Sequence, residues 1–126
     1  MSDKPVRQPG PDHPIDVQPA SGPVTVRWRD KVIAETDSAL MLREAGYPSV
    51  PYLPLADVVE DVLEPTDHAT YCPYKGDAAY FSLHDETAGA HADNAVWTYP
   101  APHAAVAEIA NHVAFYPDQV DIDLPE

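Results

Sequence analysis

The sequence predicts one mainly β domain, a small two-sheet sandwich or open barrel of short antiparallel strands with one short C-terminal helix. Three observations favour this class. The chain has 126 residues, which suits one domain of ordinary size. Hydrophobic residues alternate with polar ones in several short segments, as in half-buried strands. Fifteen prolines and five glycines punctuate these segments, so that turns are frequent.

Residues 1–23 are predicted to form a disordered or extended tail. Six of the fifteen prolines fall in this segment, hydrophobic residues are few, and the prolines follow no helix or strand period. The folded domain is therefore expected to begin near Val24 and to span residues 24–124.

The domain is expected to open with a hairpin over residues 24–36. Val24, Val26 and Trp28 alternate with polar residues, and residues 32–36 continue as the return strand. Asp30 and Lys31 are predicted to form the two-residue turn between the two strands.

The segment 37–46 admits two interpretations. It can be a short helix that Asp37 caps and that ends at Gly46. It can also hold a strand over 39–44, paired through a turn with residues 50–53. We favour the strand, because Leu40 and Leu42 fit its alternation.

The rest of the chain is predicted to contain strands, turns and one helix. The middle of the chain is expected to begin with a turn at 55–57, a β-branched segment at 58–64 that Pro65 ends, and a polar link at 66–70. A tight turn at 71–77, a strand at 79–83, a loop at 84–90 and a strand at 91–99 are expected to follow. Helical spacing of Val106, Ile109 and Val113 predicts a helix over 103–112. Residues 114–116 and 120–124 are expected to form a last hairpin.

The charge of the chain argues against two kinds of partner. Seven Lys and Arg stand against 21 Asp and Glu, a formal net charge of −14, which disfavours nucleic acid and anionic membrane surfaces. No apolar run approaches the ~20 residues of a bilayer span, and the first residues do not resemble a signal peptide. We therefore expect a cytoplasmic protein. Cys72 is the single cysteine, so neither an intrachain disulfide nor a cysteine-rich zinc site can form.

Lys75 is the only Lys or Arg among residues 44–126, which contain 15 Asp and Glu. It can neutralise a nearby carboxylate such as Glu64, Asp67 or Asp77, or it can bind an anionic or carbonyl group of a ligand. The two roles are compatible.

Cys72 and His68 are the other candidates for chemistry. Cys72 can be a thiolate nucleophile if Lys75 or His68 lowers its pKa, or simply a packed thiol. His68, Cys72 and a nearby Asp could also ligate a metal, but the six histidines match no metal-ligand spacing, and we expect no metal. No motif for a cofactor is present, and none is expected.

Aromatic residues cluster near the same turn. Tyr71, Tyr74, Tyr80 and Phe81 lie on one side, and Trp97 and Tyr99 lie on the strand expected to pair with it. These rings can form core, or they can line an apolar pocket with polar tips.

Four segments resemble an uncharacterised microbial family, the domain of unknown function 427. They are Leu63-Glu64-Pro65-Thr66-Asp67, Tyr71-Cys72-Pro73-Tyr74-Lys75-Gly76-Asp77-Ala78-Ala79-Tyr80, Ala95-Val96-Trp97-Thr98-Tyr99-Pro100 and Val113-Ala114-Phe115-Tyr116. The resemblance covers about residues 24–124 and implies a small, mostly β domain similar to the β-tent proteins. The family is sometimes labelled nucleotidyltransferase, but this sequence lacks the glycine-serine loop and the aspartate pair that such chemistry uses. The zinc-binding cysteine pairs of β-tent relatives are also absent.

Three functional hypotheses follow. The first is a module that binds a small polar or anionic metabolite, as a monomer or homodimer. Its predicted ligand-binding residues are Cys72, Tyr74, Lys75, Asp77, Tyr80, Trp97 and Tyr99. The second is an enzyme that uses Cys72 or Lys75, with His68 as a further catalytic candidate, in group-transfer or hydrolytic chemistry. The third is a structural or dimerisation domain.

Overall fold

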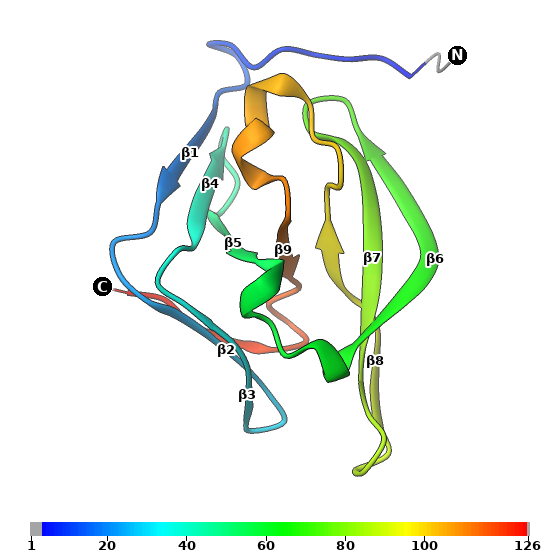
Figure 1. Cartoon of the computed structure of the whole chain (residues 1–126). Helices are drawn as coiled ribbons and strands as arrows, with labels where there is room; N and C mark the ends of the chain where they lie inside the picture. Colours follow the sequence, from blue (N-terminus) through cyan, green and yellow to red (C-terminus); the bar gives the residue numbers. More distant parts are fainter. Residues whose placement is uncertain (1–3, 126) are drawn as a thin grey trace.

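Two open antiparallel sheets make up the fold of the computed structural model, which describes residues 4–125 (Figure 1). The larger sheet has the order β1-β4-β5-β9-β8-β7-β6, and the smaller has the order β10-β2-β3. The strands are β1 Ile15–Pro19, β2 Val24–Trp28, β3 Lys31–Thr36, β4 Leu40–Glu44, β5 Val50–Pro54, β6 Leu63–Cys72, β7 Gly76–Asp85, β8 Ala90–Thr98, β9 His112–Phe115 and β10 Asp121–Asp123. Three short 3-10 turns accompany them: η1 Leu55–Asp57, η2 Glu60–Val62 and η3 Ala104–Ile109. The predicted mainly β class with two sheets is confirmed.

The core consists of two groups of buried side chains. One group lies between the sheets, where Val24, Val26 and Trp28 of β2 face Val96 of β8 and Phe115 of β9. The second group fills the other end of the large sheet and is covered by η3. It comprises Leu42, Tyr52, Ala78, Tyr80, Tyr99, Val106, Ile109 and Ala114. The curved large sheet thus packs against the small sheet at one end and against η3 at the other.

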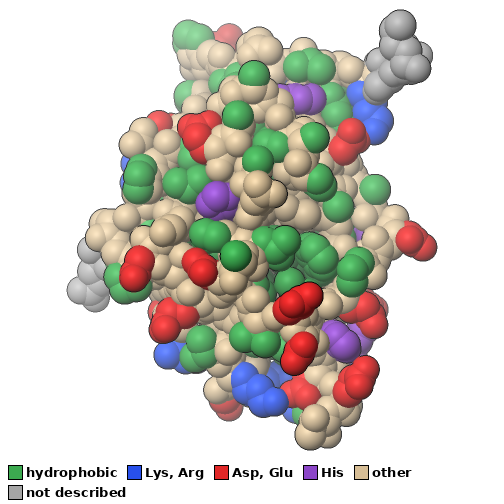
Figure 2. Space-filling view, in the orientation of Figure 1, with side chains coloured by type: hydrophobic (Ala, Val, Ile, Leu, Met, Phe, Trp, Pro, Cys, Tyr) green, Lys and Arg blue, Asp and Glu red, His purple; other side chains and the backbone are tan. Residues whose placement is uncertain are grey.

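The surface is acidic, in keeping with the sequence. Figure 2 shows carboxylates scattered over one face and hydrophobic side chains exposed near its centre. Within residues 4–125, no helix is long and apolar enough to cross a bilayer.

Several local predictions are confirmed. The hairpin of β2 and β3 forms, and residues 40–44 are a strand paired with β5. The turn of the first hairpin is shifted by one residue from the prediction. Arg29 and Asp30 occupy it with φ values of 54° and 67°, and positive φ at both central residues matches the twist of a two-residue hairpin.

The tail prediction is wrong for residues 15–19, which form the edge strand β1 and pair with β4. Ile15 and Val17 are half-buried against the second core group, while Asp16 between them and Gln18 after them are exposed. This alternation is that of a strand. The many prolines of this segment obscured the alternation in the sequence. Prolines are compatible with an edge strand, because one side of such a strand has no hydrogen-bonding partner.

Pro65 does not end a strand, contrary to the prediction, and the supposed polar link belongs to β6. β6 is the last strand of the sheet and pairs with β7 on one side only, so a proline without a donor is tolerated there. The register shifts between Pro65 and Ala69, a bulge that absorbs the intervening polar residues.

The predicted helix and the last hairpin are also corrected. η3 is a 3-10 segment and not an α-helix, because Val106 has non-helical angles (φ −128°, ψ 31°) that place both it and Ile109 in the core. β9 pairs with β5 and β8 in the large sheet, whereas β10 pairs with β2 in the small sheet. The connection after β9 therefore crosses between sheets, because β9 finds partners on both of its edges.

Two neighbouring residues of β3 provide a test of the core. Ile33 is 1% exposed and Val32 is 47% exposed. Ile33→Ala is expected to lower the free energy of unfolding by about 2–5 kcal/mol, because it opens a cavity between the sheets. Val32→Ala is expected to cost less than about 1 kcal/mol. Urea denaturation of both variants measures the difference, and equal losses would contradict this packing.

Candidate functional site

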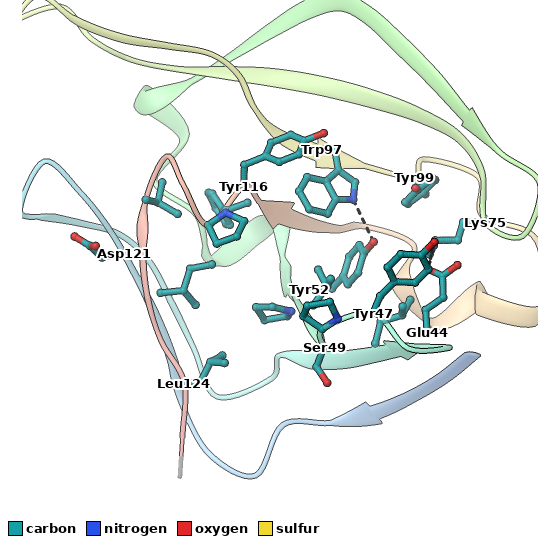
Figure 3. Close-up of a pocket in the computed structure, with 18 of the residues that line it drawn as sticks. Glu44, Tyr47, Ser49, Tyr52, Lys75, Trp97, Tyr99, Tyr116, Asp121 and Leu124 are labelled. Atoms are coloured by element: carbon teal, nitrogen blue, oxygen red, sulfur yellow. Dashed lines mark hydrogen bonds and ion pairs between the residues drawn. The ribbon is translucent and has the colours of Figure 1, made fainter. Parts of the chain in front are cut away.

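A cavity of about 1190 Å³ opens between the two sheets. The inner face of the large sheet forms one wall, and the chain from Tyr116 to Leu124 forms the opposite one (Figure 3). The β4–β5 turn, with Tyr47 and Pro48, contributes the rim. The cavity has a charged end at Glu44 and Lys75, and an aromatic middle around Tyr52, Trp97 and Tyr116.

The aromatic middle is held by contacts between its rings. The Trp97 indole Nε1 donates a hydrogen bond to the Tyr52 hydroxyl at 3.2 Å, and the two rings meet edge to face. Tyr116 lies against Trp97 with ring centroids 4.6 Å apart. Trp97 pairs in register with Ala114 of β9, and both side chains belong to the second core group. These contacts hold the rings of Tyr52, Trp97 and Tyr116 against one another.

The charged end brings together three segments that are distant in the sequence. The Lys75 ammonium donates to Glu44 Oε1, and His13 Nε2 lies 2.7 Å from Glu44 Oε2. The side chains of Lys75 and Glu44 are only 10% and 17% exposed. Burial opposes the charge of Glu44, but the hydrogen bonds with Lys75 and His13 outweigh it and hold the pKa of Glu44 below its ordinary value of 4.5.

The turn that carries Lys75 is fixed by its backbone. Lys75 N–H donates to the Cys72 carbonyl at 3.2 Å, and the Lys75 carbonyl accepts from His103 N–H at 2.9 Å. Gly76 has a φ of +113°, and an added Cβ would lie 3.4 Å from the Ala101 carbonyl oxygen. Only glycine adopts this conformation without strain, so Gly76 fixes the backbone path of the turn that carries Lys75.

Three phenols of the cavity, those of Tyr52, Tyr99 and Tyr116, have raised pKa values. Burial is the main cause that raises the pKa values of Tyr52 and Tyr99 far above the usual 10, and it raises that of Tyr116 to about 12. Within residues 4–125, the Tyr99 hydroxyl has no hydrogen-bonding partner. This hydroxyl is available to a molecule in the cavity.

Four of the predicted site residues line the cavity, namely Lys75, Tyr80, Trp97 and Tyr99. The other four lie outside its lining. The sulfur of Cys72 lies 3.8 Å from Nζ of Lys75. Tyr74 stacks on His13 with centroids 4.0 Å apart, Asp77 pairs with Lys4 at the surface, and His68 packs its ring on Tyr80.

The sequence did not indicate which carboxylate neutralises Lys75. Glu64, Asp67 and Asp77 were expected on grounds of proximity in sequence, but the partner is Glu44, which lies 31 residues away. The sequence also did not indicate that Tyr52, Tyr116 and His13 belong to the site. Local sequence patterns carry no signal for these residues, because contacts between segments that are distant in the sequence bring them together.

The candidate catalytic residues Cys72 and His68 do not form a nucleophile and base pair within residues 4–125. Among the described residues, no contact joins His68 to Cys72, so the thiol has no base beside it there. The Lys75 ammonium is engaged by Glu44. Over residues 4–125, no group of three or more His, Cys, Asp or Glu side chains is arranged to hold a metal ion.

A comparison with known protein families finds a match over most of the chain. Residues 16–125 match a family described as a domain of unknown function (DUF427), which also has the label NTP_transf_9. The match begins within β1 and covers the whole cavity lining except His13. No curated protein matches the chain.

The lowered pKa of Glu44 predicts how the charged end responds to acid. Its charge stabilises the folded state above the unfolded value of 4.5, and this stabilisation is lost as the pH falls through the lower folded pKa. Glu44→Gln is therefore expected to cost more stability at pH 6 than at pH 3. Urea denaturation of both proteins at several pH values measures this difference.

Glu108→Gln is the control, because it removes one exposed carboxylate from η3. A cost of Glu44→Gln that stays constant between pH 6 and pH 3 would contradict the charged state assigned to Glu44.

Proposed function

The chain belongs to the DUF427 family, and we propose that it is a binding domain whose cavity takes a small molecule with a ring-shaped apolar body and a polar head. The observation that carries this proposal is the combination of an aromatic cavity with a buried ion pair at one end. The head is expected at Lys75, and the ring against Trp97.

The size and the lining of the cavity support this proposal. Pockets that bind small molecules commonly measure about 300–1,000 Å³ and combine apolar walls with a few polar groups. At about 1190 Å³, this cavity accommodates a one- or two-ring compound with room for substituents toward the open side. Trp97, Tyr52 and Tyr116 offer ring faces and edges to such a body.

The charged end provides donors for a polar head. An ammonium has three N–H groups, of which the carboxylate of Glu44 and the sulfur of Cys72 engage two. The third N–H of Lys75 and the hydroxyl of Tyr99 remain for a ligand. Both belong to residues that line the cavity, so one acceptor on the ligand can contact either of them.

Removal of the indole tests the proposal. Saturation-transfer NMR would screen one- and two-ring compounds that carry a hydroxyl, carboxamide or carboxylate group. Compounds that bind the native protein are expected to bind Trp97→Ala at least about tenfold more weakly, because burial of ring surface is lost. Trp97→Phe is expected to retain part of the affinity.

Phe81→Ala is the matched control, because Phe81 is a partly buried ring on β7 outside the lining of the cavity. Urea denaturation of each variant would establish that it is folded. Unchanged binding in Trp97→Ala, or no binding by any of the compounds, would refute the proposal.

A further inference from the structure

The ion pair at the end of the cavity determines which polar head fits there. We propose that the site selects a neutral carboxamide head on an aromatic ring over the corresponding carboxylate. This inference rests on the proposed function and specifies the ligand class of the same site. It departs from the simplest expectation for a buried lysine, which is an anionic ligand.

The first argument is electrostatic. Lys75 and Glu44 are in direct contact and their charges sum to zero. A carboxylate that accepts a hydrogen bond from Lys75 would lie beside the carboxylate of Glu44, so repulsion from the second group offsets attraction by the first. Both side chains are largely buried, where solvent screens these forces weakly. The remaining charge of the chain is also strongly negative.

The second argument concerns hydrogen bonds. A carboxamide carries one acceptor and two N–H donors, so it can use both members of the pair. Its carbonyl oxygen can accept from the open N–H of Lys75, while its N–H can donate to a free lone pair of Glu44. The Tyr99 hydroxyl, which has no partner among residues 4–125, can serve either group. A carboxylate offers no donor to Glu44.

The third argument concerns the desolvation free energy of the polar head. A carboxylate loses much more hydration free energy on burial than a neutral amide does. The cavity would recover that loss for an anion only if it presented an uncompensated positive charge. The contact with Glu44 removes that possibility at Lys75, and Arg27 at the opposite wall is likewise paired with Asp123. The imidazole of His13, which also lines the cavity, is itself held against Glu44.

A matched pair of ligands tests the inference. 2-Naphthamide and 2-naphthoate have the same ring and nearly the same shape, and differ in the charge of the head. Isothermal titration of the full-length protein at pH 7.5 is expected to give an affinity for the amide at least tenfold higher than for the acid. An acid that binds as tightly as the amide, or more tightly, would overturn the inference while leaving the proposed function intact.

Glu44→Gln tests the cause. This variant leaves Lys75 without its carboxylate, so the affinity for 2-naphthoate is expected to rise at least tenfold and the preference to shift toward the acid. Asp85→Asn is the control, because it changes the net charge equally but removes the carboxylate that pairs with Lys31, outside the cavity. An equal gain in both variants would assign the effect to net charge and overturn the inference.

The two proposals fail in different ways. If neither naphthalene compound binds the native protein, the inference fails, whereas the proposed function fails only when no compound of the wider screen binds. The comparison of amide with acid in the native protein does not depend on any variant. Circular dichroism of Glu44→Gln would establish folding before its titration.

Discussion

The contact between Lys75 and Glu44 places a constraint on the whole large sheet. Glu44 ends β4, and Lys75 lies in the turn between β6 and β7, with β5, β9 and β8 between these strands in the sheet. A flat sheet would hold the two residues several strand spacings apart, at about 4.8 Å for each strand. Their direct contact therefore requires the sheet to curl. The small side chains of Ala78 and Ala114 lie inside this curve, while the longer ring of Trp97 borders the cavity.

The segment before β1 contributes to the same end of the molecule. Tyr71 donates a hydrogen bond to the Pro5 carbonyl at 2.6 Å, and Arg7 N–H donates to the Pro73 carbonyl at 2.9 Å. These contacts hold the proline-rich chain along the β6–β7 turn, and His13 follows with its stack on Tyr74 and its contact with Glu44. The cavity thus receives one lining residue from a segment whose composition alone indicates a tail.

Prediction from sequence worked where the determinants are local. Alternation located β2 and β3, and the proline and glycine around Lys75 located its turn. Of the three residues expected to share one hollow, Lys75 and Trp97 line the cavity, whereas Cys72 lies outside its lining. The pairing of Glu44 with Lys75 could not be predicted, because it depends on how a seven-stranded sheet curls. The final strands were misassigned for a related reason, since β9 and β10 belong to different sheets and nothing local distinguishes them from a hairpin.

Stability alone does not account for the charged end. Burying two charges costs hydration free energy that their mutual attraction often only balances, and apolar residues of similar volume commonly stabilise a fold as well or better. The second core group surrounds this ion pair with tyrosines and aliphatic side chains, so an apolar alternative would suit its neighbours. The Tyr99 hydroxyl lacks a partner nearby within residues 4–125. A buried ion pair that apolar residues could replace without loss of stability, and that borders a cavity, is in keeping with the proposed recognition of another molecule.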